Sequence, residues 1–147
     1  MLGCTAPSSV PSVSESPWRL VRRFHEVFGL HHPDRPTAVP PDVAEHRQQL
    51  LAEEVAEVAE AVRGGELAQI AHELADVVYV AYGTAVTYGI DLDAVLAEVH
   101  RANMSKLGRN GRPLLRADGK VLKGPEFRPA DVAAVLARQP IPDASRS

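Results

Sequence analysis

One helical segment constrains the fold more than any other feature of the sequence. From Glu66 to Tyr88, apolar residues lie on nearly every side of a helix. They are Leu67, Ile70, Leu74, Val77, Val78, Val80, Ala81, Ala85 and Val86. Because apolar side chains on every side of a helix must pack against other helices, we expect it in the middle of a helical bundle. Its uncharged part, residues 77–90, is shorter than the roughly 20 apolar residues that span a bilayer.

Four further segments have helical periodicity, and prolines and glycines separate them. They begin after Pro17, at Asp42, at Leu92 and at Pro129, and we expect Asp42 to act as an N-cap. In the loop before the last helix, an Asp-Gly pair at 118–119 favours a tight turn. No alternating run predicts a strand, so the expected fold is all-α. We expect one domain over residues 17–138, with loose tails at 1–16 and 139–147.

Composition and charge exclude several classes of function. The chain has 147 residues and a formal net charge of −3, which gives no reason to expect binding to a nucleic acid polymer. Its single cysteine, Cys4, cannot form an internal disulfide. The first sixteen residues have neither a basic start nor an apolar block, unlike a secretory signal. We therefore expect a cytoplasmic protein that does not associate with membranes.

Two pairs of carboxylates form the most informative motif. Glu54 and Glu57 lie three residues apart on one expected helix, and Glu73 and Asp76 repeat this spacing on the next. Residues three apart share a helical face. Because two glycines at 64–65 separate the helices, they can fold back as an antiparallel hairpin and bring the four carboxylates together.

This group of carboxylates predicts a metal site. Glu73 and Asp76 share a face with apolar residues, where like charges lose hydration and repel one another unless a cation neutralises them. All-oxygen donors suit Mg²⁺ or Mn²⁺, and the Glu-x-x-His motifs of di-iron bundles are absent from the sequence. For Glu53 and Glu60, an ordinary solvated charge is a competing interpretation.

A local excess of positive charge occurs between residues 101 and 128, where eight basic residues accompany two acidic ones. Asn103 and Lys106 lie three apart on an expected helix, so an amide and an ammonium can reach one ligand. Carboxylate-bound Mg²⁺ commonly leaves positions for substrate phosphates, which need basic partners. The alternative is that Lys106 interacts with the helix dipole and that the loop arginines are ordinary surface residues.

These motifs resemble those of a known superfamily. Glu54-x-x-Glu57, fifteen residues, then Glu73-x-x-Asp76 is similar to the signature of the all-α nucleoside triphosphate pyrophosphatases, which include MazG, dimeric dUTPases and phosphoribosyl-ATP pyrophosphohydrolase. A closer resemblance, over about residues 24–135, is to the MazG-like dUTPase branch typified by a Deinococcus protein. It is carried by RQQLLAEEVAEVAEA, AHELADVVYVAYGTAVTYGID, EVHRANMSK and ADGKVLKGPEFRPAD.

The resemblance implies a MazG-like four-helix bundle core that forms a homodimer. It implies Mg²⁺ binding by the four carboxylates and cleavage of a nucleoside triphosphate, dUTP or a related deoxynucleotide, to a monophosphate and pyrophosphate. Glu53 matches an additional glutamate that would position or deprotonate the attacking water. The remaining implied contacts are Asn103, Lys106, Lys120 and Lys123 with the phosphates and His25 beside the base.

Two alternatives accompany this interpretation. A phosphoribosyl-ATP pyrophosphohydrolase would share the metal site and differ only in its substrate pocket. A helical dimer would instead bind a nucleotide or a partner protein without turnover, using the same charges as a docking surface. A panel of nucleotides separates the first alternative from dUTP hydrolysis, and conservative substitutions of the carboxylates test the second.

Overall fold

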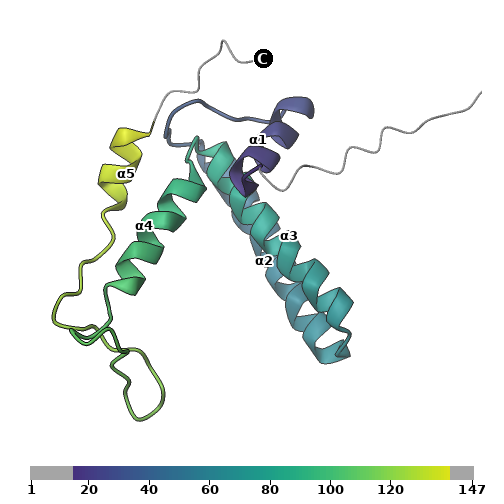
Figure 1. Ribbon diagram of the computed structural model, residues 1–147. Helices are drawn as coiled ribbons and strands as arrows, with labels where there is room; N and C mark the ends of the chain where they lie inside the picture. Colours follow the sequence, from purple (N-terminus) through teal and green to yellow (C-terminus); the bar gives the residue numbers. More distant parts are fainter. Residues whose placement is uncertain (1–14, 140–147) are drawn as a thin grey trace, which may run out of the picture.

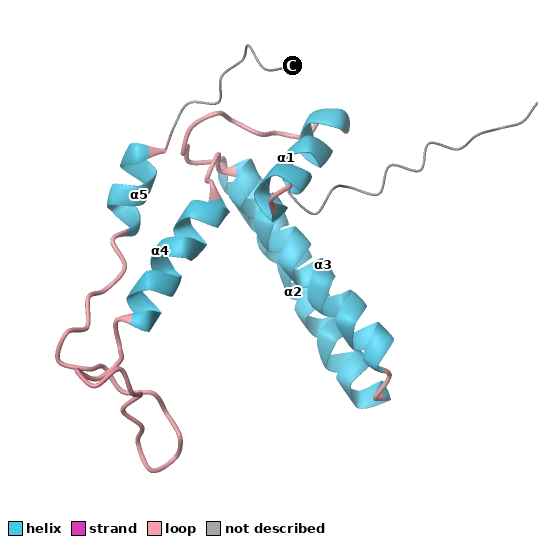
Figure 2. Cartoon of the chain, in the orientation of Figure 1, coloured by secondary structure: helices cyan, strands magenta, loops and turns pink. Residues whose placement is uncertain are grey.

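The computed structural model describes residues 15–139, and this part of the chain is all-helical (Figure 1). Its helices are α1 (Pro17–Val27), α2 (Pro41–Gly64), α3 (Leu67–Thr87), α4 (Leu92–Met104) and α5 (Val132–Arg138). Only loops connect them and the described range has no strand (Figure 2), so the predicted all-α class is confirmed. Within that range, no helix has both the length and the apolar character needed to cross a bilayer. The predicted tails fall mostly outside the described residues, and the domain bounds stay a prediction.

The helix ends follow the expected local chemistry, with one correction. Asp91 precedes α4, and its Oδ1 accepts a hydrogen bond from the backbone N–H of Ala94 at 3.1 Å. Asp42 does not cap α2, because Pro40 occupies the cap position and Pro41 begins the helix. A proline suits that place because its fixed φ is helical and its missing N–H has no partner there. Asp42 instead lies in the first turn, where its charge complements the helix dipole.

Two arms diverge from a small core (Figure 1). One arm is the antiparallel α2–α3 hairpin, against which α1 packs, and the other is α4 with α5. In the described part of the chain, α4 contacts α1 and α3 but not α2. The core lies where α1, α3 and α4 meet. It consists of Val21, Tyr82 and Val86, with Trp18 and Leu92 packed against them.

The turn between α3 and α4 joins segments that are distant in sequence. The indole N–H of Trp18 donates to the carbonyl of Ile90 at 2.8 Å, and the side-chain amide of Gln139 donates to the carbonyl of Gly89 at 2.7 Å. Gly89 has a φ of 68°, and a Cβ there would lie 2.2 Å from the carbonyl oxygen of Arg35. Only glycine therefore fits this turn.

The predicted tight turn is present in the loop between α4 and α5. Leu115 and Val121 form an isolated antiparallel bridge, and Gly119 has a φ of 83°. The backbone N–H of Arg116 donates to the carbonyl of Lys120 at 2.8 Å. The Asp-Gly signal in the sequence thus identified a real reversal of the chain, although it is too short to form a strand pair.

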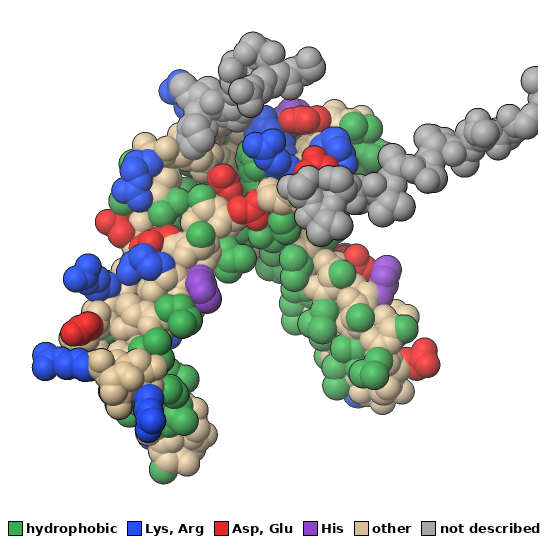
Figure 3. All heavy atoms as spheres, in the orientation of Figure 1, with side chains coloured by type: hydrophobic (Ala, Val, Ile, Leu, Met, Phe, Trp, Pro, Cys, Tyr) green, Lys and Arg blue, Asp and Glu red, His purple; other side chains and the backbone are tan. Residues whose placement is uncertain are grey.

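The central helix α3 is only partly covered by its own chain. Its side chains Leu74, Val78 and Tyr79 are 50%, 51% and 41% exposed. Val55 and Val62 on α2 are also exposed, at 53% and 57%. Figure 3 shows hydrophobic side chains along the edges of the two arms that face each other. Apolar surface this extensive is typical of a face that packs against another molecule.

Candidate functional site

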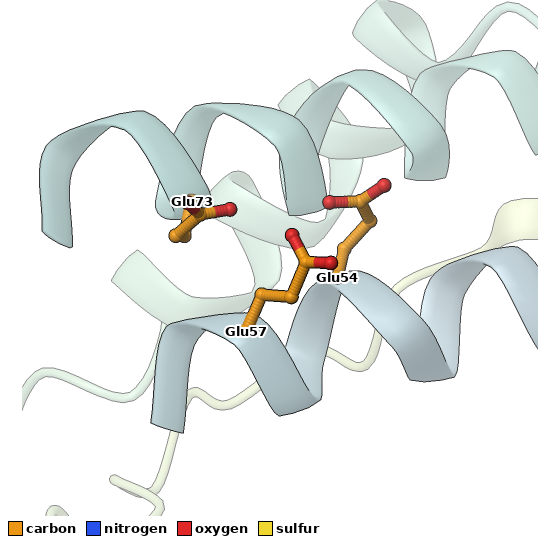
Figure 4. A group of neighbouring side chains, drawn as sticks. All are labelled: Glu54, Glu57 and Glu73. Carbon is orange, nitrogen blue, oxygen red and sulfur yellow. The ribbon is translucent and has the colours of Figure 1, made fainter. Parts of the chain in front are cut away.

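Three carboxylates from two helices meet across the α2–α3 interface. Glu54 and Glu57 project from α2 towards Glu73 on α3 (Figure 4). One carboxylate oxygen of each residue lies within 4.8 Å of one from each of the others. Glu73 is 5% exposed, Glu54 is half-buried and Glu57 is exposed. This acidic cluster therefore has a buried wall on α3 and an opening to solvent on α2.

The acidic cluster concentrates negative charge. The pKa of Glu57 is raised above its usual range by a hydrogen bond to Glu73 and by the negative charges of Glu54 and Glu73. The side-chain amide of Gln69 donates to the Glu73 carboxylate and fixes its orientation. Across residues 15–139, no Lys or Arg forms an ion pair with the three carboxylates. Three converging hard oxygen donors without a basic partner fit a divalent cation such as Mg²⁺.

Asp76 lies beside the acidic cluster rather than in it. Its Oδ2 is 3.1 Å from Nε2 of His72, one turn earlier on α3, and Asp76 is not among the carboxylates whose oxygens lie within 4.8 Å of one another. Its negative charge still reaches the site, as the smallest contribution to the raised pKa of Glu57. The structure thus gathers three of the four predicted ligands, and Asp76 stays a predicted ligand.

An acidic groove adjoins the cluster on the side of the α2–α3 turn. Its volume is about 450 Å³, and Glu57, Glu60, Glu66 and Glu73 are among its lining residues. A polyphosphate would be repelled by this many carboxylates unless cations neutralised them. Glu53 is exposed and lies outside both the cluster and the groove. Its assignment to the attacking water stays a prediction.

The predicted phosphate-binding residues lie on the other arm. Nζ of Lys106 donates to Oδ1 of Asn103 at 2.7 Å, so these two side chains meet as their spacing predicts. Lys120 and Lys123 follow in the exposed loop, where the Lys123 ammonium lies 4.6 Å from the centre of the Phe127 ring. Because α4 does not contact α2 in the described range, one chain does not bring this basic segment to the acidic cluster.

His25, predicted to lie beside the base, is only 3% exposed. Its Nδ1 is 3.0 Å from the carbonyl oxygen of His31. A carbonyl only accepts, so the neutral ring carries its proton on Nδ1 and leaves Nε2 as an acceptor. Burial lowers the pKa of His25, the bond to His31 opposes that shift, and the charge of Arg47 adds to it. His25 is therefore a buried, neutral histidine in this chain, and its place beside the base stays a prediction.

Sequence reasoning missed two polar residues of the hairpin. Gln69 holds Glu73, and the signal for it was a spacing of four residues on one helical face. Arg47 on α2 donates from Nη2 to the carbonyl of Val80 at 2.9 Å and from Nε to Oγ1 of Thr84 at 3.2 Å. Its only signal was a position seven residues before Glu54, on the same face of the helix.

Comparisons with known proteins identify a family for most of the helical region. The family model for phosphoribosyl-ATP pyrophosphohydrolase matches residues 21–103, more than half of the chain, including the acidic cluster. No curated protein gives a significant match. A solved structure from Exiguobacterium sp. 255-15, of a protein proposed to be an NTP pyrophosphohydrolase, is 26% identical. The similarity covers 85% of this chain and 96% of that one, with a TM-score of 0.46. By the family match, the chain belongs to the phosphoribosyl-ATP pyrophosphohydrolase family.

Proposed function

We propose that this protein is a metal-dependent nucleoside triphosphate pyrophosphohydrolase that cleaves between the α and β phosphates. The observation that carries the proposal is the acidic cluster, which lies within the part of the chain that the family model matches. Family membership supports hydrolysis of a phosphoanhydride bond in general. The resemblance of the sequence to the MazG-like dUTPase branch supports dUTP, or a related deoxynucleotide, as the substrate.

Mg²⁺ is the proposed cofactor, with Mn²⁺ as a substitute. Glu54, Glu57 and Glu73 would hold it, and Asp76 would join them by turning away from His72. When bound, a divalent ion neutralises phosphate charge and acidifies a coordinated water. Without a cation, the hydrogen bond to Glu73 and the negative charges of Glu54 and Glu73 raise the pKa of Glu57, so this carboxyl holds its proton more tightly than usual. The donor set and its electrostatics therefore both suit a hard divalent ion.

Other side chains of this protein would bind the nucleotide and handle the proton. Glu53, one residue before Glu54, would accept a proton from the attacking water. Asn103, Lys106, Lys120 and Lys123 would bind the phosphates and stabilise the leaving pyrophosphate, because amide and ammonium groups donate to anionic oxygens. The neutral His25 would accept a hydrogen bond from the base.

We infer that a homodimer is the active unit. The exposed apolar side chains of α3, with Leu96 and Met104 on α4, would be buried by a second copy. A second copy would also supply a basic segment to the acidic cluster, which one chain keeps apart. Sedimentation should give twice the mass of the 15.9 kDa chain, and Val78→Lys should shift the protein towards monomer. A wild-type monomer at all concentrations would contradict this inference.

The proposed activity is tested by incubating the protein with Mg²⁺ and a panel of nucleotides. Pyrophosphate should be released, and Glu54→Gln should lower kcat at least about 100-fold, since loss of even an outer-shell partner costs about 10–100-fold. Glu45→Gln, an exposed change on the same helix, should be neutral. Release of phosphate alone, or binding without turnover, would refute the proposal, and the latter would support the binding-module alternative.

Phosphoribosyl-ATP is the second candidate substrate, because the matching family model carries that name. Both substrates present the same triphosphate to the acidic cluster, so the carboxylates do not distinguish them. Direct competition between dUTP and phosphoribosyl-ATP measures the ratio of their kcat/KM values. A ratio in favour of phosphoribosyl-ATP would replace dUTP as the proposed substrate and leave the metal site unchanged.

A further inference from the structure

Arg47 is a half-buried cation that no carboxylate neutralises within residues 15–139. Its guanidinium instead donates to two oxygens of α3, the carbonyl of Val80 and the hydroxyl of Thr84. Burying a charge costs hydration, so a guanidinium held by a carbonyl and a hydroxyl alone needs a reason to be there. The contact connects the two helices that carry the acidic cluster, so it can fix their relative position.

Gly83 makes room for this contact. A Cβ at Gly83 would lie 2.6 Å from Nη2 of Arg47 and 3.3 Å from Nε2 of His25. Glycine lowers the stability of a helix interior relative to alanine, so its presence in α3 is a local cost. Val80, Gly83 and Thr84 together form a notch in the surface of α3, and Arg47 occupies it.

The Arg47 contact and the acidic cluster belong to one register of the helix pair. Arg47 lies seven residues before Glu54 on α2, and Val80 lies seven residues after Glu73 on α3. Seven residues make about two helical turns, or about 10.5 Å, and return to the same face. Because the helices are antiparallel, a slip or rotation that broke the Arg47–Val80 contact would also displace Glu54 from Glu73.

A contact that fixes the register matters in this hairpin because the carboxylates of the acidic cluster repel one another across it. Glu54, Glu57 and Glu73 place like charges across the α2–α3 interface. Apart from the bond shared by Glu57 and Glu73, the hydrogen bonds from α2 side chains to α3 in the described range come from Arg47 alone. Apolar packing is non-directional, so it does not fix the register as these bonds do.

We propose that Arg47 is a positioning residue for the acidic cluster: seated in the notch of α3, it holds Glu54 and Glu57 opposite Glu73 at the spacing that a divalent ion requires. The consequence for turnover rests on the proposed function, but the consequence for metal binding does not. Arg47→Met keeps the length of the side chain and removes its donors and charge. Arg63→Met is the matched control, because Arg63 is an exposed arginine of the same helix.

Mn²⁺ is the probe, titrated alone by calorimetry and by electron paramagnetic resonance. Arg47→Met should weaken Mn²⁺ binding about 10-fold, at the lower end of the range for outer-shell partners, while Arg63→Met leaves it unchanged. Arg47→Lys should recover part of the loss, because one ammonium replaces one of two bonds. In kinetic assays, the Mn²⁺ concentration that gives half-maximal activity should rise by a larger factor than kcat falls. A folded Arg47→Met protein with wild-type affinity for Mn²⁺ overturns the proposal.

Gly83→Ala keeps the test decisive if Arg47→Met does not fold. The new methyl group would displace the guanidinium while Arg47 itself stays in the sequence. Helix propensity alone predicts a gain in thermal stability, so weaker Mn²⁺ binding in a protein that is not destabilised would identify the contact as the cause. Unchanged affinity overturns the proposal. A wild-type chain that binds Mn²⁺ but hydrolyses no nucleotide refutes the proposed function alone, whereas one that binds no Mn²⁺ refutes both.

Discussion

The α2–α3 hairpin and the α4–α5 arm use their charged side chains in opposite ways. In the arm, Glu98 contacts Arg101 at 2.7 Å and accepts the backbone N–H of Asp131 at 2.8 Å, so its charge is matched. In the hairpin, three carboxylates face one another without a basic partner in the described range. Matched charges connect structural elements, whereas like charges held together at one interface indicate where a ligand would bind.

Glu73→Gln should have the largest effect on metal binding, because Glu73 is the buried member of the acidic cluster. Mn²⁺ affinity should fall at least about 100-fold, since a ligand matters at least as much as an outer-shell partner. Thermal stability in a chelator should not fall, because one repulsive charge is removed. Calorimetric titration and thermal unfolding measure the two quantities. A protein that is less stable but binds Mn²⁺ normally would show that Glu73 is structural.

Glu98→Gln should give the reverse pattern, with lower stability and unchanged Mn²⁺ affinity. The bonds from Arg101 and from the backbone of Asp131 lower the pKa of Glu98 from 4.5 to about 2. A lowered pKa stabilises the fold above pH 4.5, and that stabilisation is lost as the pH falls towards 2. The variant should therefore melt earlier at neutral pH and lose less stability across this acidic range. An unchanged acid unfolding curve would show that the arm does not depend on Glu98.

Glu57→Gln should show a pH dependence of the opposite sign. The pKa of Glu57 is raised, so the folded state binds its proton more tightly than the unfolded state does. Its contribution is present below pH 4.5 and is lost as the pH rises through the raised value. In a chelator, the wild type should lose stability over this rise and Glu57→Gln should not. Thermal unfolding against pH measures the difference, and parallel curves would show that Glu57 contributes no pH-dependent stability.

Local chemistry explains which parts of the molecule were predictable from sequence. Periodicity and glycine signals identified the helices, and the three-residue spacing identified Glu54, Glu57 and Glu73, because these depend on neighbours in the chain. The Asp42 cap was wrong because the preceding prolines displaced the cap and the start of α2 by two residues, from Asp42 to Pro40. The divergence of α4 from α2 was not predictable, since it depends on packing between distant segments and not on local pattern.

The contact made by Arg47 shows a second limit of prediction from sequence. Its partners are a backbone carbonyl, a hydroxyl and the empty space at Gly83, and none of these forms a charge pattern in the sequence. Carboxylates that bind a cation have a recognisable spacing in the sequence, whereas a residue that positions them has no such pattern. The acidic cluster was therefore accessible from sequence, and the residue proposed to set its geometry required the structure.

His72→Ala should have the smallest effect on Mn²⁺ binding, because both side chains of the His72–Asp76 pair are exposed. Exposed ion pairs contribute about 0–1 kcal/mol, so releasing Asp76 should strengthen Mn²⁺ binding by no more than about fivefold. The gain should disappear in the double variant with Asp76→Asn, because there the released side chain carries no charge. His46→Ala, an exposed change on α2, is the control. If Asp76→Asn alone leaves Mn²⁺ affinity unchanged, Asp76 belongs with the matched charges of the molecule, and the site consists of three carboxylates.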